Sequence, residues 1–121
     1  MLGGMTADRL YYNPSCSKCR TAWSLLSEAG HDVEQVRYLD APPTRPELEE
    51  LMGKLGITDP RDMVRTGEAV YRELGLSDAT ADALLDAIVS NPVLLERPIF
   101  VRGDRAVIAR PAERVRELLE G

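Results

Sequence analysis

The chain has 121 residues, a hydrophobic share of 44% and a formal net charge of −5 at pH 7. This length and composition are typical of one globular domain with its own core, and the negative charge argues against general binding to the phosphate backbone of nucleic acids. Aromatic residues make up only 5% of the chain, which disfavours stacking platforms for single-stranded nucleic acid, and no apolar run is long enough to cross a membrane.

The beginning of the chain lacks the basic segment followed by an apolar one that marks a secretory signal. We expect residues 1–4 to be a disordered extension and residues 5–121 to form a single domain. We also expect a monomer in the cytoplasm, with no nucleic-acid or membrane partner.

The first predicted elements are a strand, a turn, a helix and a second strand. Residues 9–12 read as a short strand, and Asn13-Pro14-Ser15 has the composition of a turn. Apolar side chains recur at helical spacing over 21–29, and residues 33–39 alternate imperfectly between apolar and polar. This order predicts a βαβ unit with parallel strands and a right-handed crossover.

Residues 44–91 are predicted to form an all-helical insertion. A pair of prolines breaks the chain, and Thr44 is expected to cap a helix that ends at Gly56. Shorter helical turns follow, and Ser77 is expected to cap a longer helix that closes at Asn91-Pro92.

The last predicted elements are a hairpin and a helix. Two β-rich runs, 98–102 and 105–109, are separated by Gly103-Asp104, which is a hairpin signal, and residues 111–119 form an amphipathic helix. The complete order is β-α-β, then helices, then β-β-α. It predicts an α/β protein with a thioredoxin-like fold whose helical insertion lies between the second and third strands.

Cys16 and Cys19 lie three residues apart where the first strand gives way to a helix. Free cysteines are often small buried hydrophobes, but a CxxC pair inside a βαβ unit favours a redox or nucleophilic role. We expect Cys16 to be an exposed thiolate that accepts hydrogen bonds from the backbone of Lys18 and Cys19 at the helix N-terminus, with Cys19 more buried and less acidic. A zinc site would need two further ligands, and because His31 is the only histidine we expect no metal.

Five further patterns are spaced along the chain in a fixed order. They are Asn13-Pro14-x-Cys16-Ser17-Lys18-x-Arg20, Leu39-x-x-Pro42-Pro43-Thr44-Arg45, Arg65-x-x-Glu68-x-x-Tyr71-x-x-Leu74-Gly75-Leu76, Asn91-Pro92-x-Leu94-x-x-Arg97-Pro98-Ile99 and Arg110-Pro111. Together they resemble the signature of the glutaredoxin-linked, thioredoxin-fold arsenate reductases of the ArsC type. The resemblance runs in register from Leu10 almost to the C-terminus.

The resemblance implies that Cys16 attacks arsenate held by Arg65, Arg97 and Arg110. Planar guanidinium groups suit a tetrahedral oxyanion that carries one to two negative charges. An ordinary ion pair with an acidic residue is the alternative for each arginine. It is weaker for Arg97 and Arg110, because each precedes a proline beside the predicted hairpin and the two should lie close together.

The same resemblance assigns further residues and partners. Ser17 and Lys18 are predicted to help bind substrate, Asn13 to shape the site, and Pro98 to follow a cis peptide bond. No bound cofactor is implied. The electrons would come from a thiol co-substrate, either glutathione with glutaredoxin or a thioredoxin-type protein.

Two positions depart from the family pattern. Many members carry Ser or Thr where this chain has Cys19, so this thiol is a candidate to resolve the reaction through a Cys16–Cys19 disulfide. A histidine is common at the position of Tyr12, and a tyrosine cannot supply the cation that would hold a thiolate.

Two other functions remain open at this level. A general thiol–disulfide oxidoreductase would need the CxxC pair but not the arginines. More distantly, Spx-type redox-sensing transcription regulators also carry a CxxC pair at this position and bind RNA polymerase. The Arg97-Pro98 and Arg110-Pro111 pairs favour the reductase.

Overall fold

The sheet of the computed structural model, which describes residues 8–119, has four strands in the order β2-β1-β3-β4. Strand β1 (Asp8–Tyr11) is parallel to β2 (Val33–Val36) and antiparallel to β3 (Ile99–Arg102), which pairs with β4 (Arg105–Ile108). The mixed sheet and its order confirm the predicted thioredoxin-like fold. The extension expected at residues 1–4 lies outside the described residues.

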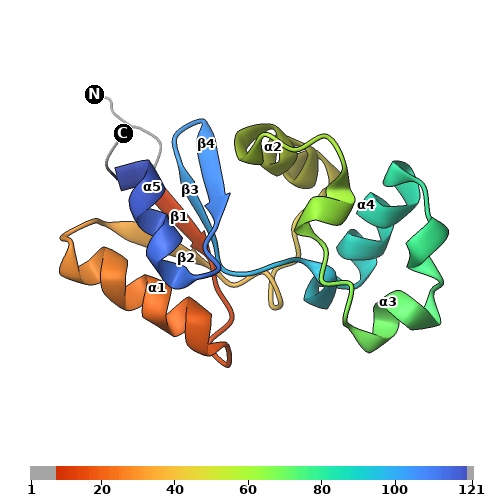
Figure 1. Cartoon of the computed structure of the whole chain (residues 1–121), viewed down its shortest axis with the longest axis horizontal. Helices are drawn as coiled ribbons and strands as arrows, with labels where there is room; N and C mark the ends of the chain where they lie inside the picture. The colour runs from red at the N-terminus through yellow and green to blue at the C-terminus, as the bar shows by residue number, and fades with distance from the viewer. Residues whose placement is uncertain (1–7, 120–121) are drawn as a thin grey trace.

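Helices cover both faces of this sheet (Figure 1). On one face lie α1 (Ser17–Glu28), the 3-10 turn η4 (Ala112–Val115) and α5 (Arg116–Leu119). The helix predicted for residues 111–119 therefore begins as a 3-10 turn, in which the N–H of Arg114 bonds to the carbonyl of Pro111 three residues back.

The insertion covers the opposite face and lies between β2 and β3, as predicted. It consists of α2 (Arg45–Leu55), η1 (Pro60–Met63), α3 (Ala69–Glu73), η2 (Leu76–Asp78), α4 (Ala81–Ser90) and η3 (Pro92–Leu94). A capping box at Thr44 starts α2 as expected.

The cap of α4 differs from the prediction. Helix α4 begins after Thr80, whose side chain accepts a hydrogen bond from Ala83 N–H, whereas Ser77 lies within η2. Gly75 adopts a left-handed conformation and directs Leu76 into the core. The chain is therefore turned before it reaches Thr80, and the longer helix starts later than residue 77.

Two cores flank the sheet because successive strand residues point to opposite faces. Leu10 and Phe100 join the core under α1 and α5, which also contains both cysteines. Tyr11 and Ile99 join the core under the insertion. No helix within residues 8–119 is long and apolar enough to span a membrane.

Candidate active site

The turn between β1 and α1 places Cys16 at the start of the helix. The side-chain oxygen of Asn13 accepts a hydrogen bond from the N–H of Ser15 at 2.9 Å, and the N–H of Cys16 donates to the carbonyl of Asn13, also at 2.9 Å. Cys16 is the N-cap residue of α1 and has an extended backbone, so its side chain lies beside the unpaired N–H groups of the first turn. The predicted strand–turn–helix is therefore present.

The Cys16 side chain is buried, with 9% of its surface exposed, which corrects the expectation of an exposed thiol. It packs within the core on the α1 side, where Tyr12 and Ala112 are also buried. Burial raises the pKa of the Cys16 thiol, but hydrogen bonding from Cys19 and Lys18 and the charge of Arg110 outweigh that effect. The net pKa lies below its ordinary value, which favours the nucleophilic thiolate.

Cys19 has the opposite character. It is fully buried, and burial raises its pKa to about 12. The interaction between the two thiols contributes to this raised pKa and lowers the pKa of Cys16. Near neutral pH Cys16, at the N-terminus of α1, is therefore the more acidic thiol, and Cys19, one turn into the helix, stays protonated.

Arg97 and Arg110 lie together, at the start and just beyond the end of the hairpin. The Nη1 of Arg110 donates to the backbone carbonyl of Arg97 at 3.0 Å. The Nε and Nη1 atoms of Arg97 are buried and have no hydrogen-bond partner within residues 8–119. The Arg97–Pro98 peptide bond is cis, and so is the Arg110–Pro111 bond, for which no such expectation was drawn.

Arg65 comes from the insertion and is held by two carboxylates. Val64 and Leu95 form an isolated antiparallel bridge, which brings Arg65 beside Glu96 although they are far apart in the sequence. The guanidinium of Arg65 forms a close ion pair with Glu68, and its Nε lies 4.0 Å from a carboxylate oxygen of Glu96. The ordinary ion pair weighed for this arginine is therefore present.

A cavity of about 300 Å³ lies between these groups. Its walls are Val64, Arg65, Thr66, Gly67, Glu68, Glu96 and Arg110. Arg97 is not among them, but Glu96 immediately precedes it in the chain. Arg110 lines the cavity, and its positive charge also lowers the pKa of both cysteines. It has the volume and the cations to receive a small oxyanion.

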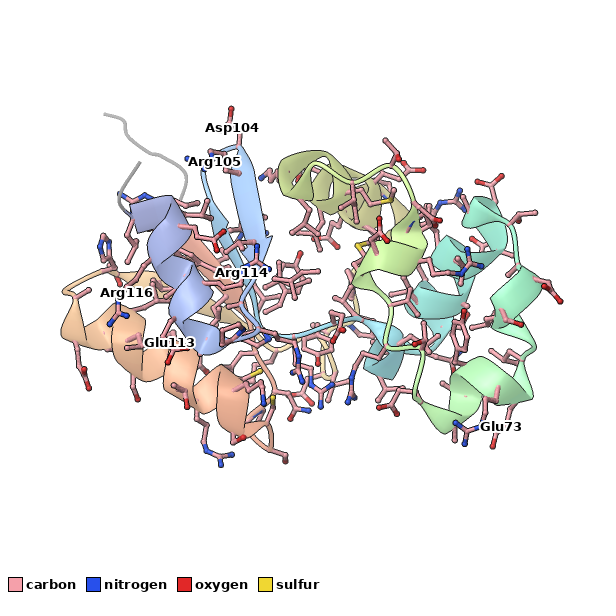
Figure 2. All side chains as sticks on the ribbon, viewed as in Figure 1. Glu73, Asp104, Arg105, Glu113, Arg114 and Arg116 are labelled. Carbon is pink, nitrogen blue, oxygen red and sulfur yellow. The ribbon has the colours of Figure 1, made fainter. Side chains whose placement is uncertain are left out.

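A second cavity, of about 390 Å³, lies between β4, α5 and the end of α2. Arg114 lines it and is labelled in Figure 2, but its guanidinium already pairs with Glu117. Neither cysteine lines either cavity, but the smaller one is lined by Arg110, whose charge lowers the pKa of Cys16. The smaller cavity is therefore the better candidate site.

Some predicted site residues lie outside the cavity. The side chains of Ser17 and Lys18 are exposed and do not line it, although the backbone of Lys18 interacts with the Cys16 sulfur. The guanidinium carbon of Arg37 lies over the ring of Tyr12, 5.6 Å from the centroid of that ring. Tyr12 also packs edge-on against Trp23. No group of three or more His, Cys, Asp and Glu in residues 8–119 is arranged to hold a metal ion.

Sequence reasoning missed roles for Glu68, Glu96 and Tyr38. Burial raises the pKa of Tyr38, and the charges of both thiols, Arg65 and Glu96 all act on its hydroxyl. Tyr38 therefore lies within electrostatic range of both cysteines and of two residues that line the cavity. In the sequence it reads only as an apolar strand residue. Glu68 stands three residues after Arg65, a spacing that signals a helical ion pair, but Glu96 gives no local signal.

Comparisons with known proteins find relatives that match nearly the whole chain. The chain is 44% identical over 117 residues to an arsenate reductase of Neisseria meningitidis, covering 95% of this chain and 100% of that protein. It is 36% identical over 117 residues to an arsenate reductase of Escherichia coli, covering 95% and 82%. A solved arsenate reductase from Vibrio cholerae superposes with a TM-score of 0.89 at 38% identity, covering 94% of this chain and 98% of that one.

The family comparison covers both halves of the molecule. The profile of the ArsC family matches residues 11–118, from the end of β1 through the insertion to α5. This span contains the turn at Cys16 and all three predicted arginines. On this match and on the similarity of sequence and fold, the chain belongs to the ArsC family.

Proposed function

We propose that this protein reduces arsenate to arsenite, with Cys16 as nucleophile. The observations that carry the proposal are the lowered pKa of Cys16 and a cavity lined by Arg65 and Arg110. Arg110 contributes to both parts, since its charge favours the thiolate and its side chain lines the cavity. The names of the relatives support the same activity.

The proposed reaction passes through a sulfur–arsenic bond. The Cys16 thiolate attacks arsenic(V), and one oxygen leaves as water after taking up protons. A second thiolate then attacks the sulfur of Cys16, so that a disulfide forms and the S–As bond breaks. The electron pair of that bond remains on arsenic, which departs as arsenite. Two thiols have then lost two electrons, and a thiol donor returns them.

Arginines would assist at two moments. In the free enzyme they favour the thiolate through their positive charge. During attack, negative charge grows on the oxygens of arsenic, and fixed guanidinium donors stabilise that charge without rearrangement. We assign this role to Arg65, Arg97 and Arg110, as the family resemblance implies.

The second thiolate is best supplied from outside the chain. Cys19 is fully buried, and its pKa of about 12 keeps it protonated near neutral pH. A low thiolate fraction makes a slow attacker. The proposed role of Cys19 is therefore to donate its S–H to the Cys16 thiolate, while glutathione or a dithiol protein performs the second attack.

The test measures arsenite formation with glutathione and glutaredoxin, and separately with thioredoxin. The wild type should form arsenite with at least one donor, and Cys16→Ser should form none. Absence of arsenite with every donor would refute the proposed function. Cys19→Ser retains a hydrogen-bond donor and should keep activity, whereas Cys19→Ala should lower it. Loss in Cys19→Ser only with thioredoxin would instead assign Cys19 as the resolving thiol.

A general thiol–disulfide oxidoreductase is the second candidate, because the CxxC pair at a helix N-terminus is sufficient for it. The two functions differ in their need for the cavity. Arg65→Met removes a guanidinium that lines the cavity and should abolish arsenite formation in a reductase. It should leave disulfide exchange nearly unchanged in a general oxidoreductase. Measuring both reactions on the same variant separates the two.

A further inference from the structure

The candidate oxyanion cavity contains as many carboxylates as guanidinium groups. Glu68 and Glu96 line the same walls as Arg65 and Arg110, and both carboxylates approach Arg65. The formal charges of these four side chains cancel. A cavity built to attract any multiply charged anion would leave its cations unopposed, so the two carboxylates require an explanation of their own.

Both carboxylates are held in place. Glu96 follows the bridge residue Leu95, and its N–H donates to the carbonyl of Met63 at 2.9 Å. Glu68 occupies the N-cap position of α3, yet its side chain makes no capping bond and pairs with Arg65 instead. The side chains of Glu68 and Glu96 are 26% and 27% exposed, so solvent screens them only in part.

We propose that Glu68 and Glu96 select oxyanions that still carry a proton. This inference rests on the proposed function of the cavity as an oxyanion site. An ionised carboxylate is an acceptor only, so it can satisfy a ligand O–H but repels a bare anionic oxygen. Near neutral pH arsenate and phosphate retain an O–H group, whereas sulfate has none. The carboxylates therefore admit protonated arsenate or phosphate and reject sulfate.

The same two residues thus serve two purposes. Their pairing with Arg65 fixes the guanidinium when no anion is bound. When a protonated oxyanion enters, its unprotonated oxygens face Arg65 and Arg110 while its O–H donates to a carboxylate. A site that depends on a ligand hydrogen bond rejects analogues lacking it strongly, because its own polar groups are then left unpaired.

The test compares inorganic phosphate with sulfate, neither of which reacts with a thiol. Calorimetric titrations of the reduced wild-type protein at pH 7 and constant ionic strength should give at least tenfold tighter binding of phosphate. The ratio of phosphate affinity to sulfate affinity should fall in Glu68→Gln, in Glu96→Gln and in the double variant. In the double variant this ratio should fall at least tenfold. Glu96→Asp keeps a carboxylate and should keep the preference.

Glu73→Gln is the matched control. Glu73 is exposed at the end of α3 (Figure 2) and does not line the cavity. Its replacement changes the net charge by the same amount as either single glutamine variant. The ratio of phosphate to sulfate affinity should be unchanged in this variant. Melting curves of all variants establish that each one is folded before its binding is compared.

Three results would overturn the inference. They are equal affinity of the wild type for the two anions, no binding of either anion, and an equal increase in affinity for both anions in the glutamine variants. The last would mean that the carboxylates merely neutralise Arg65. Arsenite formation by the wild type is scored separately. If it persists while selectivity is absent, the proposed reductase stands and only the role of Glu68 and Glu96 falls.

Discussion

Replacement of Arg97 by methionine should stabilise the free protein and weaken its response to oxyanions. Two nitrogen atoms of this guanidinium are buried without hydrogen-bond partners in residues 8–119. A buried donor without a partner destabilises the fold, and apolar replacements of buried ions often increase stability. Methionine has a similar length and no polar N–H group, so it removes this penalty.

The magnitude follows from the two unpaired atoms. An unsatisfied buried donor costs about 1–3 kcal/mol, and the partial exposure of the rest of Arg97 places the net effect near the lower end, about 1–2 kcal/mol. For a domain of this size, that free energy corresponds to a rise in Tm of roughly 3–10 °C. Phosphate at about 100 times its Kd should stabilise the wild type by about 2.7 kcal/mol, and Arg97→Met should lose most of this increment.

The assay is thermal unfolding followed by circular dichroism, in sodium phosphate and in sodium chloride of equal ionic strength. Arg116→Met is the control, since Arg116 is exposed on α5 and labelled in Figure 2. It should change neither the Tm nor the phosphate effect appreciably. A lower Tm for Arg97→Met than for the wild type, with the phosphate effect intact, would refute the reasoning.

Three further outcomes are expected. Iodoacetamide at pH 7 should label Cys16 and spare Cys19, as read by mass spectrometry, because burial and the opposite pKa shifts separate them; labelling of Cys19 first would contradict this assignment. The free energy of unfolding should fall as pH rises from about 8.5 towards 12, since unfolded Cys19 loses its proton there while the folded thiol keeps it; urea titrations of Cys19→Ala should show a smaller decline. Thr44→Ala should cost about 1 kcal/mol in urea unfolding, because it removes the capping box of α2, without altering phosphate affinity; a cost near zero would argue against that cap.

Local chemistry made the surroundings of Cys16 predictable. Asn13 and Pro14 specify a turn, and apolar spacing specifies the helix after it. The hairpin was predictable for a similar reason, since Gly103 adopts a positive φ of 64° that β-branched residues avoid. The five spaced motifs then indicated the ArsC family, and the order of strands and helices indicated a thioredoxin-like fold.

The burial of Cys16 was not predictable from the turn alone. Cys16 is buried in a core that also contains Ala112, which lies near the other end of the chain. The pairing of Arg65 with Glu96 depends likewise on the bridge between Val64 and Leu95. Sequence patterns report local periodicity and spacing, so contacts made by tertiary bridges stay hidden from them. The capping error at residue 77 was local, since the true cap, Thr80, lies only three residues later.

The candidate site draws on both halves of the molecule. Cys16 belongs to the core beneath α1, and Arg110 follows β4. Arg65 lies in the middle of the insertion and Glu96 just after its last turn, next to the bridge between Val64 and Leu95. A βαβ unit with a CxxC pair would suffice for an acidic thiol. It could not surround an anion, because the cations and carboxylates opposite the thiol come from the insertion and the hairpin. In the proposed reductase, the insertion would therefore convert a reactive cysteine into a site that selects its electrophile.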